Sequence, residues 1–118
     1  MIPPLPPAAH DVRLFAYGEL CKPAVLVELI GRVPLAEPAL LHGYRRELVR
    51  ETGYYLAIPR DGASIAGLLF DELGAAELLV LDRYEDVAGG EYERRELEVE
   101  RLISGSREPA FVYVSRPW

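Results

Sequence analysis

The feature that most constrains the fold of this chain is a succession of strand-like stretches separated by turn residues. In the middle of the sequence these stretches cover 39–49, 54–59 and 65–70. The segment Arg60-Asp61-Gly62 separates the last two, and an Asp-Gly pair is typical of the tight turn of a β-hairpin. The pattern therefore predicts two short strands that pair through a turn at these three residues.

Two further strands are indicated near the C-terminus. Leu97, Val99 and Ile103 alternate with glutamates, which predicts a strand with one face in solvent. Residues 111–114 are apolar on both faces, so we expect that strand to lie in the centre of a sheet. The glutamates are interpreted as a solvated face rather than as metal ligands.

Two helices are expected between these strands. Residues 13–17 form a short apolar run typical of a buried strand. After it, Pro23 suits the first turn of a helix that continues through Ile30 and stops at Gly31. The segment 75–86 has no Pro or Gly and predicts a second helix. Together with about six strands, the two helices indicate an α+β domain built on a small closed or nearly closed sheet.

Length and charge exclude several classes of protein. The chain has 118 residues, 50% of them hydrophobic, which fits one globular domain with a single core. Its net charge of -6 argues against a nucleic-acid surface or an anionic membrane partner, because both recruit clustered Lys and Arg. No apolar run approaches the roughly 18 residues of a membrane helix. The single cysteine, Cys21, cannot form an internal disulfide, so we expect a cytoplasmic location.

The N-terminus and the motif content add little chemistry. The first ten residues carry four prolines, which predicts a flexible proline-rich arm over 1–11, followed by one domain over 12–118. The sequence has no Gly-rich phosphate loop, no pair of His at metal spacing and no nucleophile elbow, so it indicates no metal or cofactor. Cys21 is interpreted as a small buried thiol rather than a nucleophile, since no His is placed to activate it.

Glu85 carries the clearest chemical signal. At roughly 100° per residue it falls between Leu78 and Leu81 on the second predicted helix, so its carboxylate is expected to be half buried. Desolvation and the negative end of the helix dipole both raise the pKa of such a group. A carboxylate with a raised pKa can serve as general base or acid near neutral pH. The competing interpretation is that the helix frays and Glu85 turns to solvent or pairs with Arg83 or Arg94.

Several short motifs occur in an order and at a spacing shared with a known family. The opening motif is Leu-Phe-Ala-Tyr-Gly-Glu-Leu at 14–20. The others are Gly-Tyr at 43–44, Ile-Ala-Gly-Leu-Leu-Phe at 65–70, Leu-Asp-Arg-Tyr-Glu at 81–85, Glu-Tyr-Glu-Arg at 91–94 and Val-Tyr-Val at 112–114. Over 12–115 the chain thus resembles the gamma-glutamylcyclotransferase-like proteins, whose first strand leads into a Tyr-Gly-Ser-Leu type loop. The resemblance implies that family's small mixed β-barrel with flanking helices.

The resemblance also implies a reaction. In such a cyclotransferase, the α-amino group of a γ-glutamyl amine or peptide attacks its own γ-carbonyl. This step forms 5-oxoproline and expels the amine without a cofactor or an external nucleophile. The acid at the position of Glu85 would be the general base and acid. Backbone N–H groups of the loop after the first strand would bind the substrate carboxylate or the developing oxyanion. This loop consists of Tyr17, Gly18, Glu19 and Leu20.

Two positions depart from the family pattern. Glu19 stands where the family usually has Ser or Thr, and Asp86 stands where Gly commonly follows the catalytic acid. If Glu19 faces the cavity, it repels an anionic α-carboxylate and couples to the titration of Glu85. If Asp86 is close to Glu85, its like charge raises the pKa of Glu85 further. Tyr113 is expected either to reach the same cavity with its hydroxyl or to satisfy a backbone carbonyl.

Two other kinds of function fit the same residues. The first is a non-catalytic small-molecule binding module, which keeps the barrel and its pocket but has lost turnover through Glu19. The second is an interaction protein that works through the proline-rich arm and the terminal Arg116-Pro117-Trp118. The cyclotransferase is the preferred hypothesis, and its partner is a small γ-glutamyl substrate.

Overall fold

The centre of the structure is a closed β-barrel, seen in a computed structural model that describes residues 12–87, 89–90 and 92–115. The proline-rich arm expected over 1–11 and the terminal 116–118 lie outside the described residues. The barrel order is β1-β3-β2-β4-β5, with β1 and β5 parallel and the other neighbours antiparallel. The strands are β1 (Val12–Ala16), β2 (Ala36–Val49), β3 (Tyr54–Leu73), β4 (Tyr92–Arg101) and β5 (Arg107–Ser115).

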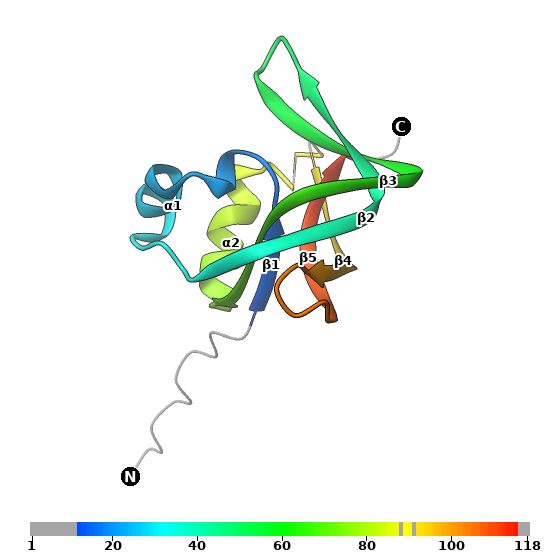
Figure 1. Ribbon diagram of the computed structural model, residues 1–118. Coiled ribbons are helices and arrows are strands. Elements are labelled where there is room, and N and C mark those ends of the chain that lie inside the picture. The colour runs from blue at the N-terminus through cyan, green and yellow to red at the C-terminus, as the bar shows by residue number, and fades with distance from the viewer. Residues whose placement is uncertain (1–11, 88, 91, 116–118) are drawn as a thin grey trace.

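Two helices lie on one side of the barrel (Figure 1). After β1 the chain makes a 3₁₀ turn, η1 (Glu19–Cys21), and then forms α1 (Pro23–Ile30); α2 (Ala75–Tyr84) follows β3. Pro23 opens α1 and Gly31, at φ 77°, ends it, as the sequence predicts. Neither described helix has the length and apolar character that a membrane crossing needs. The barrel with its two helices confirms the predicted α+β class.

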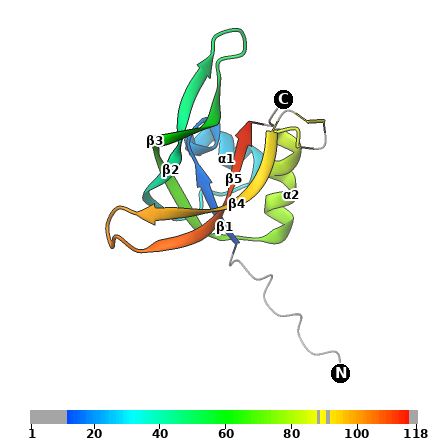
Figure 2. The same ribbon diagram turned by 90° about the vertical axis from the view of Figure 1, so that its right-hand side faces the viewer.

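The predicted hairpin turn at Arg60-Asp61-Gly62 is wrong. β3 continues without a break through these residues, and the turn that joins it to β2 lies at 50–53. The described barrel therefore has five strands rather than about six. We call the part of the β2–β3 hairpin over 44–59 the hairpin arm. Its tip projects beyond the barrel in Figure 1 and in Figure 2, whereas Ala57 near its base is buried in the barrel core.

The Asp-Gly pair makes a bulge instead of a turn. The pairing of β2 with β3 shifts between His42 and Tyr44, and residues 60–63 of β3 have no partner in β2. Gly43 and Gly62 have φ angles of 82° and 80°, a left-handed conformation that suits a bulge as well as a hairpin turn. The bulge separates the barrel portion of both strands from the hairpin arm.

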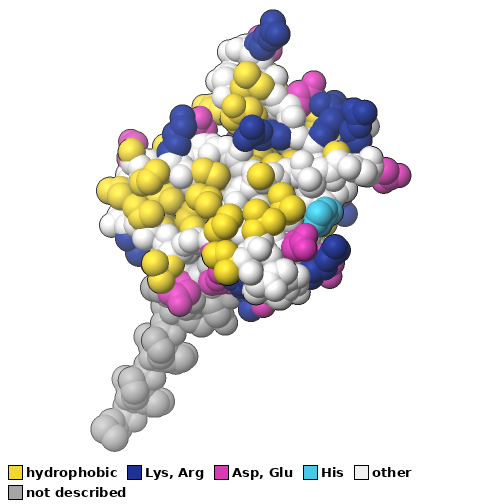
Figure 3. All heavy atoms as spheres, in the orientation of Figure 1, with side chains coloured by type: hydrophobic (Ala, Val, Ile, Leu, Met, Phe, Trp, Pro, Cys, Tyr) yellow, Lys and Arg dark blue, Asp and Glu magenta, His cyan; other side chains and the backbone are white. Residues whose placement is uncertain are grey.

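Two hydrophobic clusters fill the domain, and the side chains of β1 alternate between them. One cluster lies inside the barrel and contains Phe15, Leu41, Leu69, Val99 and Val112. The other lies between the barrel and the helices and contains Leu14, Leu26, Phe70, Leu78 and Leu81. This alternation follows from the period of two residues in a strand. Hydrophobic side chains also gather on the outer face that carries α1 and the start of β2 (Figure 3), where Val27 and Leu35 are exposed.

The two C-terminal strands match their predictions except at one residue. β5 is central, since it pairs with β1 on one side and with β4 on the other. In β4, Val99 is buried and Leu97 packs against the barrel core, as the alternation predicts. Ile103 departs from it because β4 ends at Arg101, and the Ile103 side chain lies in the following turn, 77% exposed.

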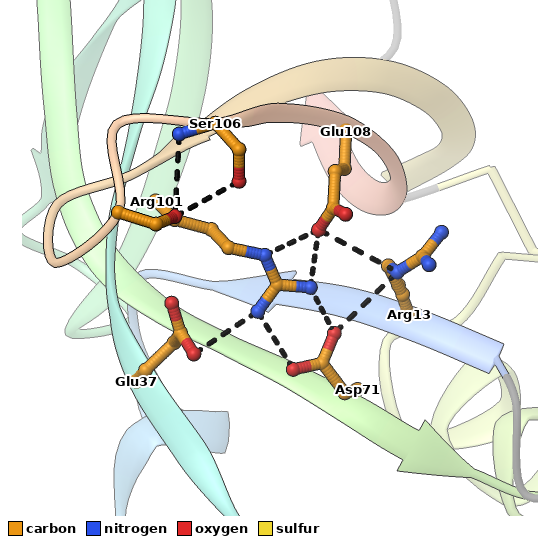
Figure 4. A network of polar contacts seen from close by, with 7 residues as sticks. Arg13, Glu37, Asp71, Arg101, Ser106 and Glu108 are labelled. Atoms are coloured by element: carbon orange, nitrogen blue, oxygen red, sulfur yellow. Dashed lines mark hydrogen bonds and ion pairs between the residues drawn. The ribbon is translucent and has the colours of Figure 1, made fainter.

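One end of the barrel is closed by an ion cluster around Arg101 (Figure 4). The Arg101 guanidinium donates from Nη1 to Oδ2 of Asp71 at 2.8 Å, lies 3.0 Å from Oε2 of Glu37 and contacts Glu108. Nε of Arg13 lies 3.4 Å from Asp71 and 3.8 Å from Glu108. Each of the five strands contributes one of these residues, which we call the Arg101 cluster. The hydrogen bond from Arg101 lowers the pKa of the Asp71 carboxyl.

Candidate active site

A pocket of about 300 Å³ opens at the end of the barrel opposite the Arg101 cluster, where β1 passes into η1. The pocket contains all of the site residues that the sequence predicts. They are Tyr17, Gly18, Glu19, Leu20, Glu85 and Tyr113. Its remaining walls come from β1, the hairpin arm, the end of α2 and the start of β4. They are Phe15, Ala16, Tyr54, Tyr55, Tyr84, Asp86 and Tyr92.

Glu85 is held in the pocket wall by the end of α2. The helix stops at Tyr84, two residues earlier than predicted, and Glu85 is its C-terminal cap, with its N–H donating to the carbonyl of Leu81 at 2.9 Å. The side chain is half buried, in agreement with the prediction. Burial, followed by the negative charge of Glu19, raises the pKa of Glu85 to about 7. Glu85 therefore has the environment of a usable general base.

Of the two arginines that the competing interpretation assigns to Glu85, Arg94 is paired with another residue and Arg83 has no ion pair with Glu85 in the structure. Nη1 of Arg94 donates to Oδ2 of Asp82 at 2.8 Å, and Asp82 lies one helical turn before Glu85. Among the described residues, no cationic side chain forms an ion pair with Glu85. The sequence analysis did not identify Asp82, although its spacing of three residues from Glu85 places both on one side of the helix.

The buried tyrosines present their rings to the pocket while their hydroxyl groups bind the protein. The Tyr17 hydroxyl donates to the carbonyl of Tyr113, and the Tyr113 hydroxyl donates to Oδ1 of Asp82 at 2.7 Å. Tyr113 thus binds a carboxylate rather than the backbone carbonyl of the alternative prediction. The Tyr92 hydroxyl donates to the carbonyl of Tyr55 at 2.8 Å. Burial raises the pKa of Tyr17 and Tyr113, so both phenols stay protonated and shape the pocket.

The loop after β1 is fixed from two sides. The N–H of Cys21 donates to the carbonyl of Gly18 at 2.9 Å, which closes η1. From the hairpin arm, Nη1 of Arg46 donates to the carbonyl of Tyr17 at 3.3 Å, and its guanidinium lies 4.4 Å from the centre of the Tyr55 ring. The loop and the hairpin arm therefore meet at the pocket through one arginine.

The two departures from the family pattern have different outcomes. Glu19 lines the pocket and its charge contributes to the raised pKa of Glu85, which confirms the predicted coupling. Asp86 also lines the pocket, but burial and Glu19 are the causes of the shift in Glu85. The Asp86 carboxylate lies over Gly89, where an added Cβ would be 2.3 Å from Oδ1. Asp86 has φ 53°, a conformation that Gly adopts more readily, which explains the family preference for Gly there.

Cysteine and histidine play no part in the pocket that the structure describes. Cys21 is half buried and does not line the pocket, and burial raises the pKa of its thiol. His42 lies on β2, where its Nε2 is 2.8 Å from Oε1 of Glu100. In the described part of the chain, no three His, Cys, Asp or Glu side chains are grouped as metal ligands.

The sequence matches the family described as gamma-glutamyl cyclotransferase, AIG2-like, over residues 14–117. The chain belongs to this family. A relative named protein AIG2 C, from Arabidopsis thaliana, is 30% identical over 108 residues, which cover 92% of this chain and 62% of the relative. A gamma-glutamylcyclotransferase of Methanocaldococcus jannaschii is 37% identical over 78 residues, or 66% of this chain and 35% of that protein.

A solved structure shows that the gamma-glutamyl cyclotransferase, AIG2-like fold extends over most of the described domain. An Arabidopsis thaliana protein solved in solution is 25% identical and superposes with a TM-score of 0.80 over 88% of this chain and 68% of that one. The matched regions cover 62% and 35% of the two sequence relatives named above, so the chain spans less than two thirds of the length of either one. The family match over residues 14–117 includes both helices and all of the residues that line the pocket.

Proposed function

We propose that this protein releases 5-oxoproline from a γ-glutamyl amine or peptide, with Glu85 as the general base and then the general acid. The observation that carries the proposal is the half-buried Glu85 carboxyl, which forms no ion pair with a described cationic residue and has its pKa raised to about 7 in the wall of a pocket. Membership of the gamma-glutamyl cyclotransferase, AIG2-like family supports this reaction.

The proton balance of the reaction suits a single carboxylate. The substrate α-ammonium must lose a proton before its nitrogen can attack the γ-carbonyl carbon, and ionised Glu85 accepts that proton. Attack forms the C–N bond of the five-membered ring, and Glu85 returns the proton to the amide nitrogen as the old C–N bond breaks. The ring nitrogen loses a second proton, so that the products are the 5-oxoproline lactam and a protonated amine. A group with a pKa near 7 can accept and return protons at neutral pH.

In this reaction the main task of the pocket is to orient the substrate rather than to supply reactive groups. Because the nucleophile and the carbonyl belong to one molecule, holding them in a near-attack geometry gives an effective molarity of roughly 10⁵ M or more. The pocket volume of about 300 Å³ suits a small substrate. In this proposal, backbone N–H groups of the loop formed by Tyr17, Gly18, Glu19 and Leu20 bind the substrate carboxylate or the developing oxyanion. Gly18 leaves the backbone open to close approach by a ligand.

The proposal is tested by incubating the protein with a panel of γ-glutamyl amines and dipeptides and detecting 5-oxoproline by mass spectrometry. Release of 5-oxoproline in proportion to protein concentration supports the cyclotransferase. Calorimetric binding of a panel member without any release of 5-oxoproline would identify a binding module of the same fold instead. If no panel member binds or reacts, the proposed substrate class is wrong.

A further inference from the structure

The walls of the pocket are aromatic and acidic, which restricts the leaving amine that fits there. Six of the seven tyrosines in the chain line the pocket, and so do Glu19, Glu85 and Asp86. None of the described lining residues is a Lys or an Arg, and the nearby Arg46 guanidinium is bound to the Tyr17 carbonyl and lies over the Tyr55 ring. A ligand with a net positive charge is therefore better matched to these walls than a neutral or anionic one.

Glu19 already binds an ammonium group in this structure. Its Oε1 lies 3.0 Å from Nζ of Lys22, whose side chain is 63% exposed while that of Glu19 is 25% exposed. An ion pair with a largely exposed lysine contributes little to stability, because water solvates the ammonium well when the pair separates. A ligand ammonium that enters the pocket can thus replace Lys22 at little cost.

Two partly exposed aromatic residues line the same pocket as Glu19. Tyr54 of the hairpin arm is 46% exposed and Tyr84 of α2 is 38% exposed, and both line the pocket. Burial raises the pKa of Tyr84, and the charges of Glu19 and Glu85 raise it further, which places the phenol close to both acids. The face of a tyrosine ring attracts a cation, so these rings add to the attraction of the Glu19 carboxylate.

We propose that Glu19, Tyr54 and Tyr84 form a subsite for a positively charged group on the leaving amine, so that the preferred substrates are γ-glutamyl monoamides of diamines. The inference rests on the proposed function and names its substrate class. A γ-glutamyl amide of a neutral amine carries no net charge, because its ammonium and carboxylate cancel. A diamine supplies the extra positive charge that Glu19 can bind, while an amino acid supplies a further negative charge that Glu19 repels.

Three substrates of equal length test the subsite. They are the γ-glutamyl monoamide of diaminobutane, γ-glutamyl pentylamide and γ-glutamyl aminopentanoate, which end in an ammonium, a methyl and a carboxylate group. For release of 5-oxoproline we expect kcat/KM to be about tenfold higher for the diaminobutane amide than for the pentylamide, with the aminopentanoate lowest. Equal values for the ammonium and methyl substrates would overturn the subsite while leaving the proposed reaction intact.

Substitution of Glu19 tests whether this one residue causes the preference for the substrate that ends in an ammonium group. Glu19→Gln should reduce the ratio of kcat/KM between the diaminobutane amide and the pentylamide to near one. The ratio is the useful quantity because any change in Glu85 affects both substrates of one variant equally. Glu96→Gln is the matched control, since Glu96 lies exposed on β4 outside the pocket and its loss changes the net charge by the same amount. An equal fall of the ratio in both variants would indicate general electrostatic attraction and overturn the subsite.

Binding to a Glu85→Gln variant separates this inference from the proposed reaction. By calorimetry the diaminobutane amide should bind about tenfold more tightly than the pentylamide, and adding Glu19→Gln should remove that difference. If no substrate releases 5-oxoproline but this binding preference is found, the reaction is wrong and the cation subsite stands. If 5-oxoproline is released but binding shows no preference, the reaction stands and the cation subsite is wrong.

Discussion

At one end of the barrel the Arg101 cluster surrounds guanidinium groups with the carboxylates of Glu37, Asp71 and Glu108, whereas at the other end Glu85 faces a pocket without a described cationic partner. The same chemical group consequently titrates in opposite directions. A hydrogen bond from Arg101 lowers the pKa of Asp71, while burial and Glu19 raise that of Glu85 to about 7. The comparison shows that a carboxylate bound by an arginine is held ionised, whereas one that is buried without such a partner has a raised pKa and can exchange a proton near neutral pH.

The two ends also differ in the number of strands that they join. The Arg101 cluster takes one residue from each of the five strands, and its ion pairs directly join the neighbouring strands β1–β3, β1–β5, β2–β4 and β4–β5. The pocket end is held instead by hydrogen bonds of tyrosine hydroxyls to carbonyl groups and to Asp82. Stability is therefore expected to be concentrated at the Arg101 cluster and chemistry at the pocket.

The largest expected effect is on activity at the pocket end. Glu85→Gln should keep the fold and lower kcat/KM for 5-oxoproline release by roughly 10²–10⁴-fold, because the amide has the shape of the carboxyl but cannot accept a proton. Glu96→Gln, on the exposed face of β4, is the matched control and should keep near wild-type kcat/KM. Near wild-type turnover by Glu85→Gln would show that another group is the base.

Substitution of Arg101 is expected to lower the stability of the fold. Arg101→Met keeps most of the aliphatic stem but leaves Glu37 without its ion pair and Asp71 and Glu108 with Arg13 alone, so we expect unfolding to become easier by about 3 kcal/mol at pH 7. The Arg101 side chain is only 13% exposed, whereas that of Arg107, paired with Glu98, is 55% exposed. Arg107→Met should therefore cost less than about 0.5 kcal/mol. Urea unfolding measures both, and equal losses would show that the Arg101 cluster is an ordinary surface network.

The raised pKa of Glu85 predicts that wild type and Glu85→Gln differ in stability by an amount that depends on pH. Its folded pKa of about 7 lies above the 4.5 of an ordinary glutamate, so the folded state binds an extra proton between these values and loses stability as pH rises through them. Glu85→Gln removes this loss. The variant should be more stable than wild type by roughly 2 kcal/mol at pH 8 and equal to it at pH 4, after allowance for partial solvent screening. A constant difference in urea unfolding at the two pH values would contradict the buried environment.

The smallest effect concerns the coupling between the two pocket acids. Glu19→Gln removes a negative charge that helps to raise the pKa of Glu85, so the acid limb of the kcat/KM profile should move to lower pH. The limb should stay above the range of an ordinary glutamate, because burial is the larger cause of the shift. Glu96→Gln should leave the limb in place. A limb that does not move in Glu19→Gln would show that Glu19 and Glu85 titrate independently.

The sequence correctly predicted those features that depend on residues close together in the chain. Pro23 and Gly31 bound α1 where the structure has it, and the apolar residues around Glu85 correctly indicated a half-buried carboxylate. The Asp-Gly pair misled, because the left-handed φ of Gly62 serves a bulge as well as a hairpin turn. Local sequence alone does not show whether the strand continues beyond such a glycine.

Contacts between distant residues were missed for a different reason. The members of the Arg101 cluster are spread from Arg13 to Glu108, and only the register of the closed barrel brings them together. The rim tyrosines Tyr54 and Tyr55 reach the pocket because the hairpin arm continues past the bulge. A sequence pattern that assigned a turn at Arg60-Asp61-Gly62 could not have placed them there.

The bulge between Gly43 and Gly62 determines which part of the pocket is altered by sequence changes in the hairpin arm. It divides the pocket into a part that α2 and β1 hold in place, which includes Glu85, and a rim that the hairpin arm brings in, which includes Tyr54. Insertions, deletions and substitutions near the 50–53 turn alter the rim while leaving the proton-transfer residue where it is. Under the proposed function, changes in this one hairpin can therefore alter which amine is released without displacing Glu85.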